Sequence, residues 1–230
     1  MATSTDGRRI RACVFDAYGT VLDVHSAIRR QGFALGSSAD RVSQTWRTKQ
    51  LEYAWVRSLA GRHADFWSCT TDALEYSLRL HGADPGLRDD LLEAYRTLDA
   101  FADVAPTLER LRGEDVKVAI LSNGSPRMLD DALRSAGLTD FLQNCISIED
   151  AGIYKPAPAA YRLAVERLAL GADAIGFLSS NAWDIMGARS FGFTPVWVNR
   201  AQMPDEYGVS ATVHQTRSLT DAVAHLCNIR

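Results

Sequence analysis

The sequence predicts an α/β fold, in which helices cover both faces of a doubly wound parallel sheet and a helical segment is inserted after the first strand. Apolar, strand-like runs alternate with helix-like patterns over most of the chain, as in βα units joined by right-handed crossovers. The stretch from about residue 24 to residue 100 breaks this alternation, because it holds helical patterns alone. Polar loops follow several of the strand-like runs, and ligands bind at this edge of such sheets.

Five apolar runs are the expected strands of the sheet. Each run ends in a polar loop, and helix-like patterns lie between most of them. The expected strands are residues 10–16, 116–122, 145–148, 174–179 and 194–199, and the expected helices between them are residues 105–112, 126–136, 157–170 and 183–191. The last stretch, SLTDAVAHLCNI, predicts an amphipathic helix that closes the fold.

The inserted segment carries its own helix signals. Its longest pattern is SADRVSQTWRTKQLEYAWVRSLA. A later stretch, DPGLRDDLLEAYRTL, begins with Asp84 in a capping position and Pro85 at the first turn, which is the chemistry of a helix start. The segment therefore predicts a helical insert, and a chain of 230 residues is long enough for a core and a smaller attached domain.

The composition is that of an ordinary globular enzyme, with 47% apolar and 23% charged residues. The net charge of −3 gives no reason to expect nucleic acid as a partner. No apolar run suits a signal peptide or a membrane span, so we expect a soluble, cytoplasmic protein. The four cysteines form no CxxC pair and the five histidines form no HxH or HxxxH set, which argues against a zinc site and a thiol redox motif.

The run CVFDAYGT places Asp16 at the end of the first strand and gives it no acidic neighbour at position 18, which is Tyr18. The carboxylate could simply cap the following loop, and from the residues alone this interpretation is as good as a functional one. Thr20 could donate a hydrogen bond back to Asp16 or cap a helix. Neither residue decides between the two interpretations.

Two further loops bring polar groups to the same edge. Ser122 and Asn123 in LSNGS could cradle an anion together with backbone N–H groups, or could form an ordinary turn and helix cap. Lys155 in IYKPAP precedes Pro156, which holds the lysine in an extended conformation and is expected to begin the next helix. Most single lysines are solvated surface residues, but one fixed in this way is well placed to lie beside a carboxylate.

The fourth loop, FLSSNAWDIMGA, carries Ser179, Ser180, Asn181 and Asp184. This pattern could be a helix cap. Independent caps, however, do not require loops from four separate strands to carry polar groups to one edge of one sheet. We therefore expect a shared site at that edge.

Arg47 lies in the longest helical pattern of the insert, at spacings of four, seven and eight residues from Leu51, Ala54 and Trp55. These spacings put the four residues on one helix face, so Arg47 is expected to be the single guanidinium group on an otherwise apolar surface. From the residues alone, an arginine that extends its charged end to solvent at the rim is the favoured interpretation.

In this order, FDAYGT, LSNGS, YKPAPAAY and SSNAWD closely resemble the motifs of the haloacid dehalogenase superfamily, and within it those of the L-2-haloacid dehalogenases. The resemblance covers nearly the whole chain and includes WRTKQLEYAWVRSL, which resembles the cap helix of that subfamily. It implies a Rossmann-like core of about residues 8–21 and 104–230. It also implies a helical cap domain of about residues 22–103 that closes over the carboxyl edge of the sheet.

Most members of the superfamily are phosphatases, so hydrolysis of a small phosphate ester is the alternative function. Phosphatase members carry DxD, whose second acid protonates the leaving alkoxide, and Tyr18 stands in that place here. They also carry a Mg²⁺-binding acid four residues before the position matching Asp184, where this chain has Ser180. A halide leaves without a proton, so we expect dehalogenation with no metal and no cofactor.

The resemblance implies hydrolysis of short-chain L-2-haloalkanoic acids to D-2-hydroxy acids. Asp16 would attack C2 of the substrate in an SN2 step, release halide and form a covalent ester that water then cleaves. Lys155 would keep Asp16 charged and oriented, and Thr20 would donate a hydrogen bond to it. The residues that would order the charged network or place the water are Ser179, Asn181 and Asp184.

The resemblance also implies how the substrate is held. Arg47 and Asn123 resemble the halide cradle, and Trp183 resembles one of its walls. The residues expected to bind substrate are Ser122, Asn123, Tyr161, Tyr18, Trp183 and Phe66. The expected partners are the 2-haloacid and water, with no nucleic acid and no membrane. Because many relatives pair through the cap, we also expect a homodimer.

Overall fold

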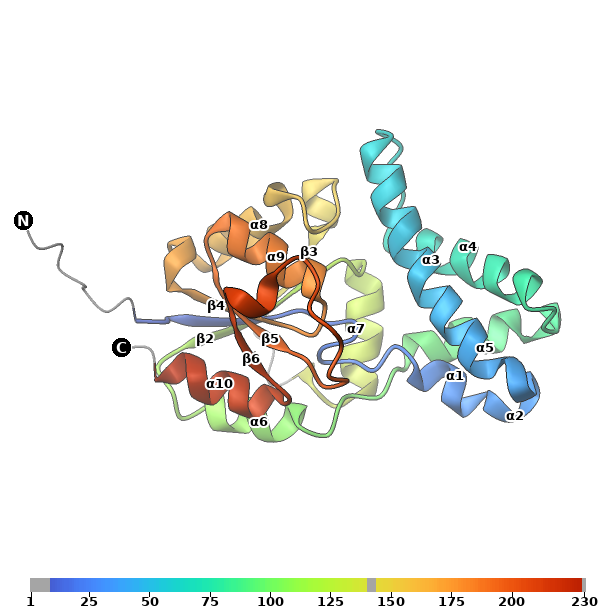
Figure 1. Cartoon of the computed structure of the whole chain (residues 1–230), viewed down its shortest axis with the longest axis horizontal. Helices are drawn as coiled ribbons and strands as arrows, with labels where there is room; N and C mark the ends of the chain where they lie inside the picture. The colour runs from blue at the N-terminus through green and yellow to red at the C-terminus, as the bar shows by residue number, and fades with distance from the viewer. Residues whose placement is uncertain (1–8, 140–143, 229–230) are drawn as a thin grey trace, which may run out of the picture.

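The computed structural model describes residues 9–139 and 144–228. Six parallel strands form one sheet in the order β3-β2-β1-β4-β5-β6 (Figure 1). The chain winds from β1 toward one edge and then returns from β4 toward the other, so the predicted doubly wound α/β fold is confirmed. The strands are β1 Ala12–Phe15, β2 Lys117–Ser122, β3 Asn144–Ser147, β4 Ile175–Ser179, β5 Thr194–Val198 and β6 His214–Thr216.

Helices cover both faces of this sheet. Helices α6 and α10 pack together on one face, and helices α8 and α9 pack together on the other (Figure 1). The central strand between them is fully apolar and at most 1% exposed, as expected for a strand of a parallel sheet. The helices of this part are α6 Val104–Leu111, α7 Pro126–Ser135, α8 Pro158–Leu168, α9 Ala182–Phe191 and α10 Leu219–Cys227.

The inserted segment forms a group of helices at one end of the sheet (Figure 1). Helices α3 and α4 pack side by side, and α5 contacts α7 of the sheet-containing part. We call this group the cap helices: α1 Ser26–Arg30, α2 Gly32–Leu35, α3 Ala39–Leu59, α4 Phe66–Leu80 and α5 Arg88–Arg96. Short 3-10 helices are η1 Gly36–Ser38, η2 Pro85–Leu87, η4 Ile148–Ala151, η5 Ala172–Ala174 and η6 Val209–Ala211.

The two connections to the cap helices run beside each other. Leu22 and Ala100 form an antiparallel bridge. On either side of it, the backbone N–H of Asp23 donates to Asp99 O at 2.8 Å and that of Phe101 donates to Val21 O at 3.1 Å. The cap helices therefore leave and rejoin the sheet through one short two-stranded ribbon.

Most expected elements are confirmed, with two differences. The capping role of Asp84 is confirmed, because its side chain accepts a hydrogen bond from Gly86 N at 2.8 Å and Pro85 begins η2. The expectation that Pro156 begins a helix is wrong, since α8 begins at Pro158. Strand β6 was not expected, because it is three residues long, lies at an edge and contains no buried residue.

Residues 8, 140–143 and 229–230 belong to the expected core, and Ile229 to the expected closing helix, but all of them lie outside the described residues. Within the described ranges, no helix combines the length and apolar character needed to cross a membrane.

Candidate active site

The candidate site lies where the winding of the sheet reverses, between β1 and β4. Ligands bind outside the carboxyl ends of the strands at such a point. Asp16 follows the last residue of β1, and Ser179 is the last residue of β4. Because these strands pair in parallel, the two side chains reach the same edge, and Ser179 Oγ lies 3.4 Å from Asp16 Oδ2.

Both carboxylate oxygens of Asp16 accept hydrogen bonds, although the residue is only 4% exposed. Oδ1 accepts from Lys155 Nζ at 2.8 Å. Oδ2 accepts from Thr20 Oγ1 at 3.0 Å and from Asn181 Nδ2 at 2.8 Å, besides the longer contact with Ser179. Several donors therefore fix this carboxylate in one orientation at the mouth of the site.

The ammonium group of Lys155 lies between two carboxylates. Its three protons are directed to Asp16 Oδ1 at 2.8 Å, Asp184 Oδ2 at 2.6 Å and Leu121 O at 3.0 Å, and the side chain is fully buried. Burial lowers the pKa of Lys155, but the charges of Asp16 and Asp184 outweigh this effect and raise the pKa above its ordinary value. The lysine is therefore a permanent cation at neutral pH.

The backbone of Lys155 is held from both sides. Its N–H donates to Asn123 Oδ1 at 3.1 Å, and its carbonyl oxygen accepts from the indole Nε1 of Trp55 at 2.9 Å. Asn123 follows β2, whereas Trp55 belongs to cap helix α3. A cap helix thus takes part in positioning the lysine.

Asp184 is the second buried acid of the site. Its Oδ1 accepts from the hydroxyl of Tyr161 at 2.7 Å, and its Oδ2 accepts from Lys155. Burial raises the pKa of Asp184 to about 6, against the opposing effects of Lys155 and Tyr161. A carboxylate with this pKa is suited to accept a proton near neutral pH.

The loop after β4 is tied to the turn after β1. Ser180 N donates to Thr20 Oγ1 at 2.8 Å, and Ser180 Oγ accepts from Arg200 Nη1 at 3.1 Å. Gly19 has a φ of +96°, and a Cβ there would lie 3.7 Å from Asn181 Nδ2 and 3.9 Å from Arg47 Nη2. These are ordinary contact distances, so it is the backbone conformation that favours a glycine in this turn.

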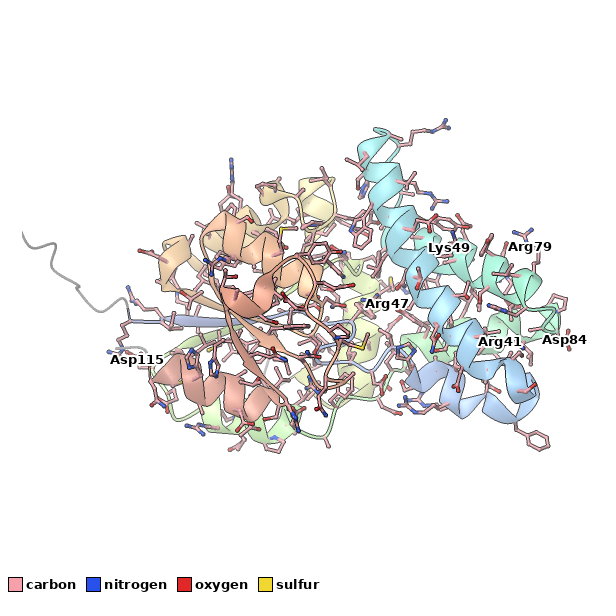
Figure 2. All side chains as sticks on the ribbon, viewed as in Figure 1. Arg41, Arg47, Lys49, Arg79, Asp84 and Asp115 are labelled. Atoms are coloured by element: carbon pink, nitrogen blue, oxygen red, sulfur yellow. The ribbon has the colours of Figure 1, made fainter. Side chains whose placement is uncertain are left out.

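Arg47 approaches the site from the cap. It lies between helix α3 and the end of the sheet in Figure 2. Nη2 donates to Tyr18 O at 3.0 Å and Nη1 donates to Gln50 Oε1 at 2.7 Å. Leu51 and Ala54 are buried as expected, but the expectation of an otherwise apolar face is wrong, because the fully buried Gln50 lies beside Arg47.

Aromatic rings line the cap side of the site. The ring of Tyr18 stacks on Tyr95 at 5.9 Å and lies 6.0 Å from Phe66. Trp183 packs edge-to-face on Trp55 at 5.3 Å. The hydroxyl of Tyr18 is buried and has no hydrogen-bond partner among the described residues, whereas the hydroxyl of Tyr95 is paired with Gln50.

The structure brings most of the expected residues into one contact network: Asp16, Tyr18, Thr20, Arg47, Asn123, Lys155, Tyr161, Ser179, Asn181 and Asp184. Phe66 and Trp183 belong to the aromatic rings on the cap side, and Ser122 takes another position. Ser122 Oγ is fully buried and accepts from Gly124 N at 3.1 Å, as in an ordinary turn. Tyr161 is fully buried behind Asp184. The roles of all the expected site residues toward a substrate stay predictions.

Three residues with clear contacts here were not singled out for a role in the site: Gln50, Trp55 and Arg200. Gln50 accepts a hydrogen bond from Arg47, one helical turn away. Trp55 and Arg200 donate to residues that are distant in sequence, Lys155 and Ser180. A buried polar residue in an apolar helix pattern is the one sequence signal that could have identified Gln50.

A divalent cation does not fit the donor set. The Lys155 ammonium already lies between the two carboxylates, and positions 18 and 180 supply a tyrosine and a serine. In residues 9–139 and 144–228, no group of three or more His, Cys, Asp or Glu side chains is arranged to hold a metal.

A family model described as haloacid dehalogenase-like hydrolase matches residues 10–192. The chain belongs to this hydrolase family. The resemblance of the motifs to this family is therefore confirmed over most of the length of the chain.

Individual relatives and solved structures show which members of the family this chain resembles. (S)-2-haloacid dehalogenase 4A of Burkholderia cepacia is 47% identical over 92% of this chain and 93% of its own length. A crystal structure of a dehalogenase has a TM-score of 0.92 at 46% identity, covering 95% of this chain and 98% of that one. The L-2-haloacid dehalogenase of Xanthobacter autotrophicus with chloropropionic acid covalently bound has a TM-score of 0.85 at 35% identity, covering 96% of this chain and all of that one. The resemblance to L-2-haloacid dehalogenases is thereby confirmed.

Proposed function

We propose that this hydrolase removes halide from short-chain L-2-haloalkanoic acids and yields D-2-hydroxy acids. The observation that carries the proposal is the carboxylate of Asp16, which is oriented by four donors and has no acid at position 18 to protonate a leaving group. A halide needs no such proton. The names of the relatives and the covalently bound chloropropionic acid of the Xanthobacter structure support the same reaction.

In the first step a carboxylate oxygen of Asp16 attacks C2 of the substrate from the side opposite the halogen. The new C2–O bond forms as the carbon–halogen bond breaks, and the halide leaves with the bonding electron pair. The configuration at C2 inverts, and the substrate is joined to Asp16 as an ester. The donors around Asp16 contribute by holding it in the direction of attack.

In the second step water attacks the carbonyl carbon of the Asp16 ester. Asp184, with its pKa of about 6, accepts a proton from this water, and Asn181 helps to place it. The C2–O bond is not broken, so the inverted configuration is retained in the D-2-hydroxy acid. The departing alkoxide takes up the proton, and the free carboxylate of Asp16 is regenerated.

The substrate is itself an anion, and it must approach an anionic nucleophile in a poorly solvated site. Two cations offset this repulsion. Lys155 balances Asp16 and Asp184 from within the core, and Arg47 approaches from the cap. Arg47 and Asn123 receive the halide, with Trp183 as a wall, and Tyr18 and Phe66 contact the alkyl part of the substrate.

The deciding experiment compares L- and D-2-chloropropanoate in EDTA and, in parallel, p-nitrophenyl phosphate with Mg²⁺. Release of chloride from the L-isomer alone is the expected result. A single turnover in ¹⁸O-labelled water tests the ester, because the label then enters the Asp16 carboxylate and not the product. Hydrolysis of the phosphate ester without chloride release would overturn the proposal in favour of the phosphatase alternative.

We also propose how the protein is organised. Residues 8–21 and 104–230 act as a core domain, and residues 22–103 act as a cap domain over the carboxyl edge of the sheet. The ribbon that contains the Leu22–Ala100 bridge supports this division.

We propose further that the protein is cytoplasmic, acts without nucleic acid or membrane, and forms a homodimer through the cap, where Val56 and Leu59 of α3 are exposed. Light scattering on the purified protein tests the dimer.

A further inference from the structure

The cation that Arg47 brings to the site is not paired with an acid. Among the residues that the structure describes, its guanidinium donates to two neutral oxygens, Gln50 Oε1 and Tyr18 O, and takes part in no ion pair. By contrast, Arg57, Arg88 and Arg96 of the same cap helices each contact a carboxylate. The full charge of Arg47 is thus left available to an anion.

Gln50 is the residue that holds Arg47 in this state. It is fully buried, and its amide nitrogen donates to Thr70 Oγ1 at 2.6 Å and to the hydroxyl of Tyr95 at 3.0 Å. Its amide oxygen accepts from Arg47 Nη1 at 2.7 Å. One side chain therefore joins cap helices α3, α4 and α5 to the guanidinium group.

The orientation of this amide is fixed from both ends. The hydroxyl of Thr70 donates its only proton to Phe66 O at 2.7 Å, so it can only accept from Gln50. Arg47 can only donate. A reversed amide would place N–H against N–H at Arg47 and leave Thr70 without a donor, so the oxygen must face Arg47.

We infer that Gln50 is a positioning residue, which fixes Arg47 toward the site without neutralising it. The inference rests on the proposed function, because it assumes that Arg47 receives the halide and the anionic substrate. A carboxylate of the same shape at position 50 would hold Arg47 equally well but would cancel its charge in a buried setting. An apolar side chain at position 50 would leave the charge of Arg47 intact but would no longer hold its guanidinium group in place. Position and charge can thus be separated by two substitutions.

The test uses Gln50→Glu and Gln50→Met in the full-length protein, with Gln44→Glu as the matched control on the exposed side of α3. Chloride binding to the free protein is measured by quenching of tryptophan fluorescence, and KM and kcat are measured with L-2-chloropropanoate. For Gln50→Glu we expect a folded protein with a lower melting temperature, because a carboxylate cannot donate to Thr70 Oγ1. We also expect at least a tenfold loss of chloride affinity, with a matching rise in KM. For Gln50→Met we expect KM to rise and kcat to fall. For Gln44→Glu we expect KM and kcat to stay at their wild-type values.

Other outcomes are decisive as well. Wild-type chloride affinity in a folded Gln50→Glu protein would overturn the inference, as would a wild-type protein that binds no chloride. If Gln50→Glu does not fold, the test depends on Gln50→Met. Unchanged KM and kcat in that variant would show that Gln50 contributes to packing alone. A wild-type protein that binds chloride, loses this binding in Gln50→Glu, and yet releases no halide from 2-haloacids would contradict the proposed function but support the inference.

Discussion

Lys155 and Asp16 form a buried ion pair in which the ammonium nitrogen lies 2.8 Å from Oδ1, between side chains that are 0% and 5% exposed. The two residues are distant in sequence and meet because β1 and the loop before α8 reach the same edge of the sheet. The pair is also shared, since the same nitrogen lies 2.6 Å from Asp184. If the charge of Asp16 is removed, Lys155 therefore keeps Asp184 as an ion-pair partner.

Asp16→Asn should abolish halide release while the protein stays folded. An amide oxygen is a poor nucleophile, so we expect turnover to fall by at least about 10³-fold, as for other lost nucleophiles. The Asp184 partner keeps Lys155 paired, so the melting temperature should change little. Appreciable steady turnover by a homogeneous sample would show that Asp16 is not the nucleophile.

The pH dependence of kcat should report Asp184. Burial and the charge of Asp16 raise the pKa of Asp184 to about 6 in the free protein. The ester removes the charge of Asp16, so the acid limb of kcat should lie below pH 6, and there the fraction of Asp184 able to accept a proton falls about tenfold per pH unit. The raised pKa also means that protonation of Asp184 favours the folded state, a contribution that is complete at low pH and is lost as the pH rises through about 6. The loss of activity in acid should therefore occur without unfolding, which circular dichroism can check.

Tyr161→Phe should move this acid limb to higher pH. The tyrosine hydroxyl donates to Asp184 and stabilises the charged form, so its removal raises the pKa of Asp184. We expect a lower kcat at pH 6 and near-normal kcat at pH 9. An unshifted pH profile with a uniform loss of activity would assign Tyr161 to packing alone.

EDTA should leave halide release unchanged. Ser180 stands at the position where metal-dependent members of the superfamily carry an acid, and the ammonium group of Lys155 already lies between Asp16 and Asp184. The measurement is initial rate before and after exhaustive chelation, with Mg²⁺ restored in a parallel sample. Activity that chelation removes and Mg²⁺ restores would sink the metal-independent mechanism.

Trp55→Phe should weaken catalysis by a moderate factor. The substitution keeps an aromatic ring against Trp183 but removes the N–H that donates to Lys155 O. One such hydrogen bond is worth about 1 kcal/mol, so we expect a loss of about 3- to 10-fold in kcat. Trp67→Phe is the control, because the Trp67 ring packs on Arg96 and not on Trp183 or Lys155 among the described contacts. Equal losses in both variants would argue against a specific role for Trp55.

Gly187→Ala should destabilise the protein. A Cβ at this position of α9 would collide with the Tyr161 hydroxyl and lie 2.6 Å from Pro156 Cβ. We expect a loss of about 1–3 kcal/mol in the free energy of unfolding, which outweighs the better helix propensity of alanine. Gly32→Ala is the matched control, because no atom lies within 4 Å of its added Cβ. Denaturant unfolding of both variants checks the difference.

The sequence predicts the sheet side of the site well for a physical reason. The carboxyl ends of parallel strands share one edge, so polar residues that follow separate strands must meet there. Asp16, Lys155 and Asp184 are placed in this way. The strands themselves are found because burial on two faces demands continuous apolar runs, as in β1.

The cap side could not be predicted to the same extent. Which side chain a buried glutamine contacts depends on how helices pack, and Gln50 meets Thr70 and Tyr95 on two other helices. Strand β6 carries no apolar signal because its residues are partly or largely exposed at the sheet edge. The start of α8 was misplaced because both Pro156 and Pro158 satisfy the local rule for a first helical position.

The central place of β1 has a consequence for how the chain folds as it is made. Val14 pairs with Ala119 on one side and with Phe177 on the other. The ribosome therefore releases an apolar strand whose two neighbours, β2 and β4, follow only after roughly 100 and roughly 160 further residues. The helices α3 and α4 can pair with each other in the meantime, since their contacts are local. Nascent chains that end before about residue 180 should thus bind chaperones through the segment that later carries the nucleophile.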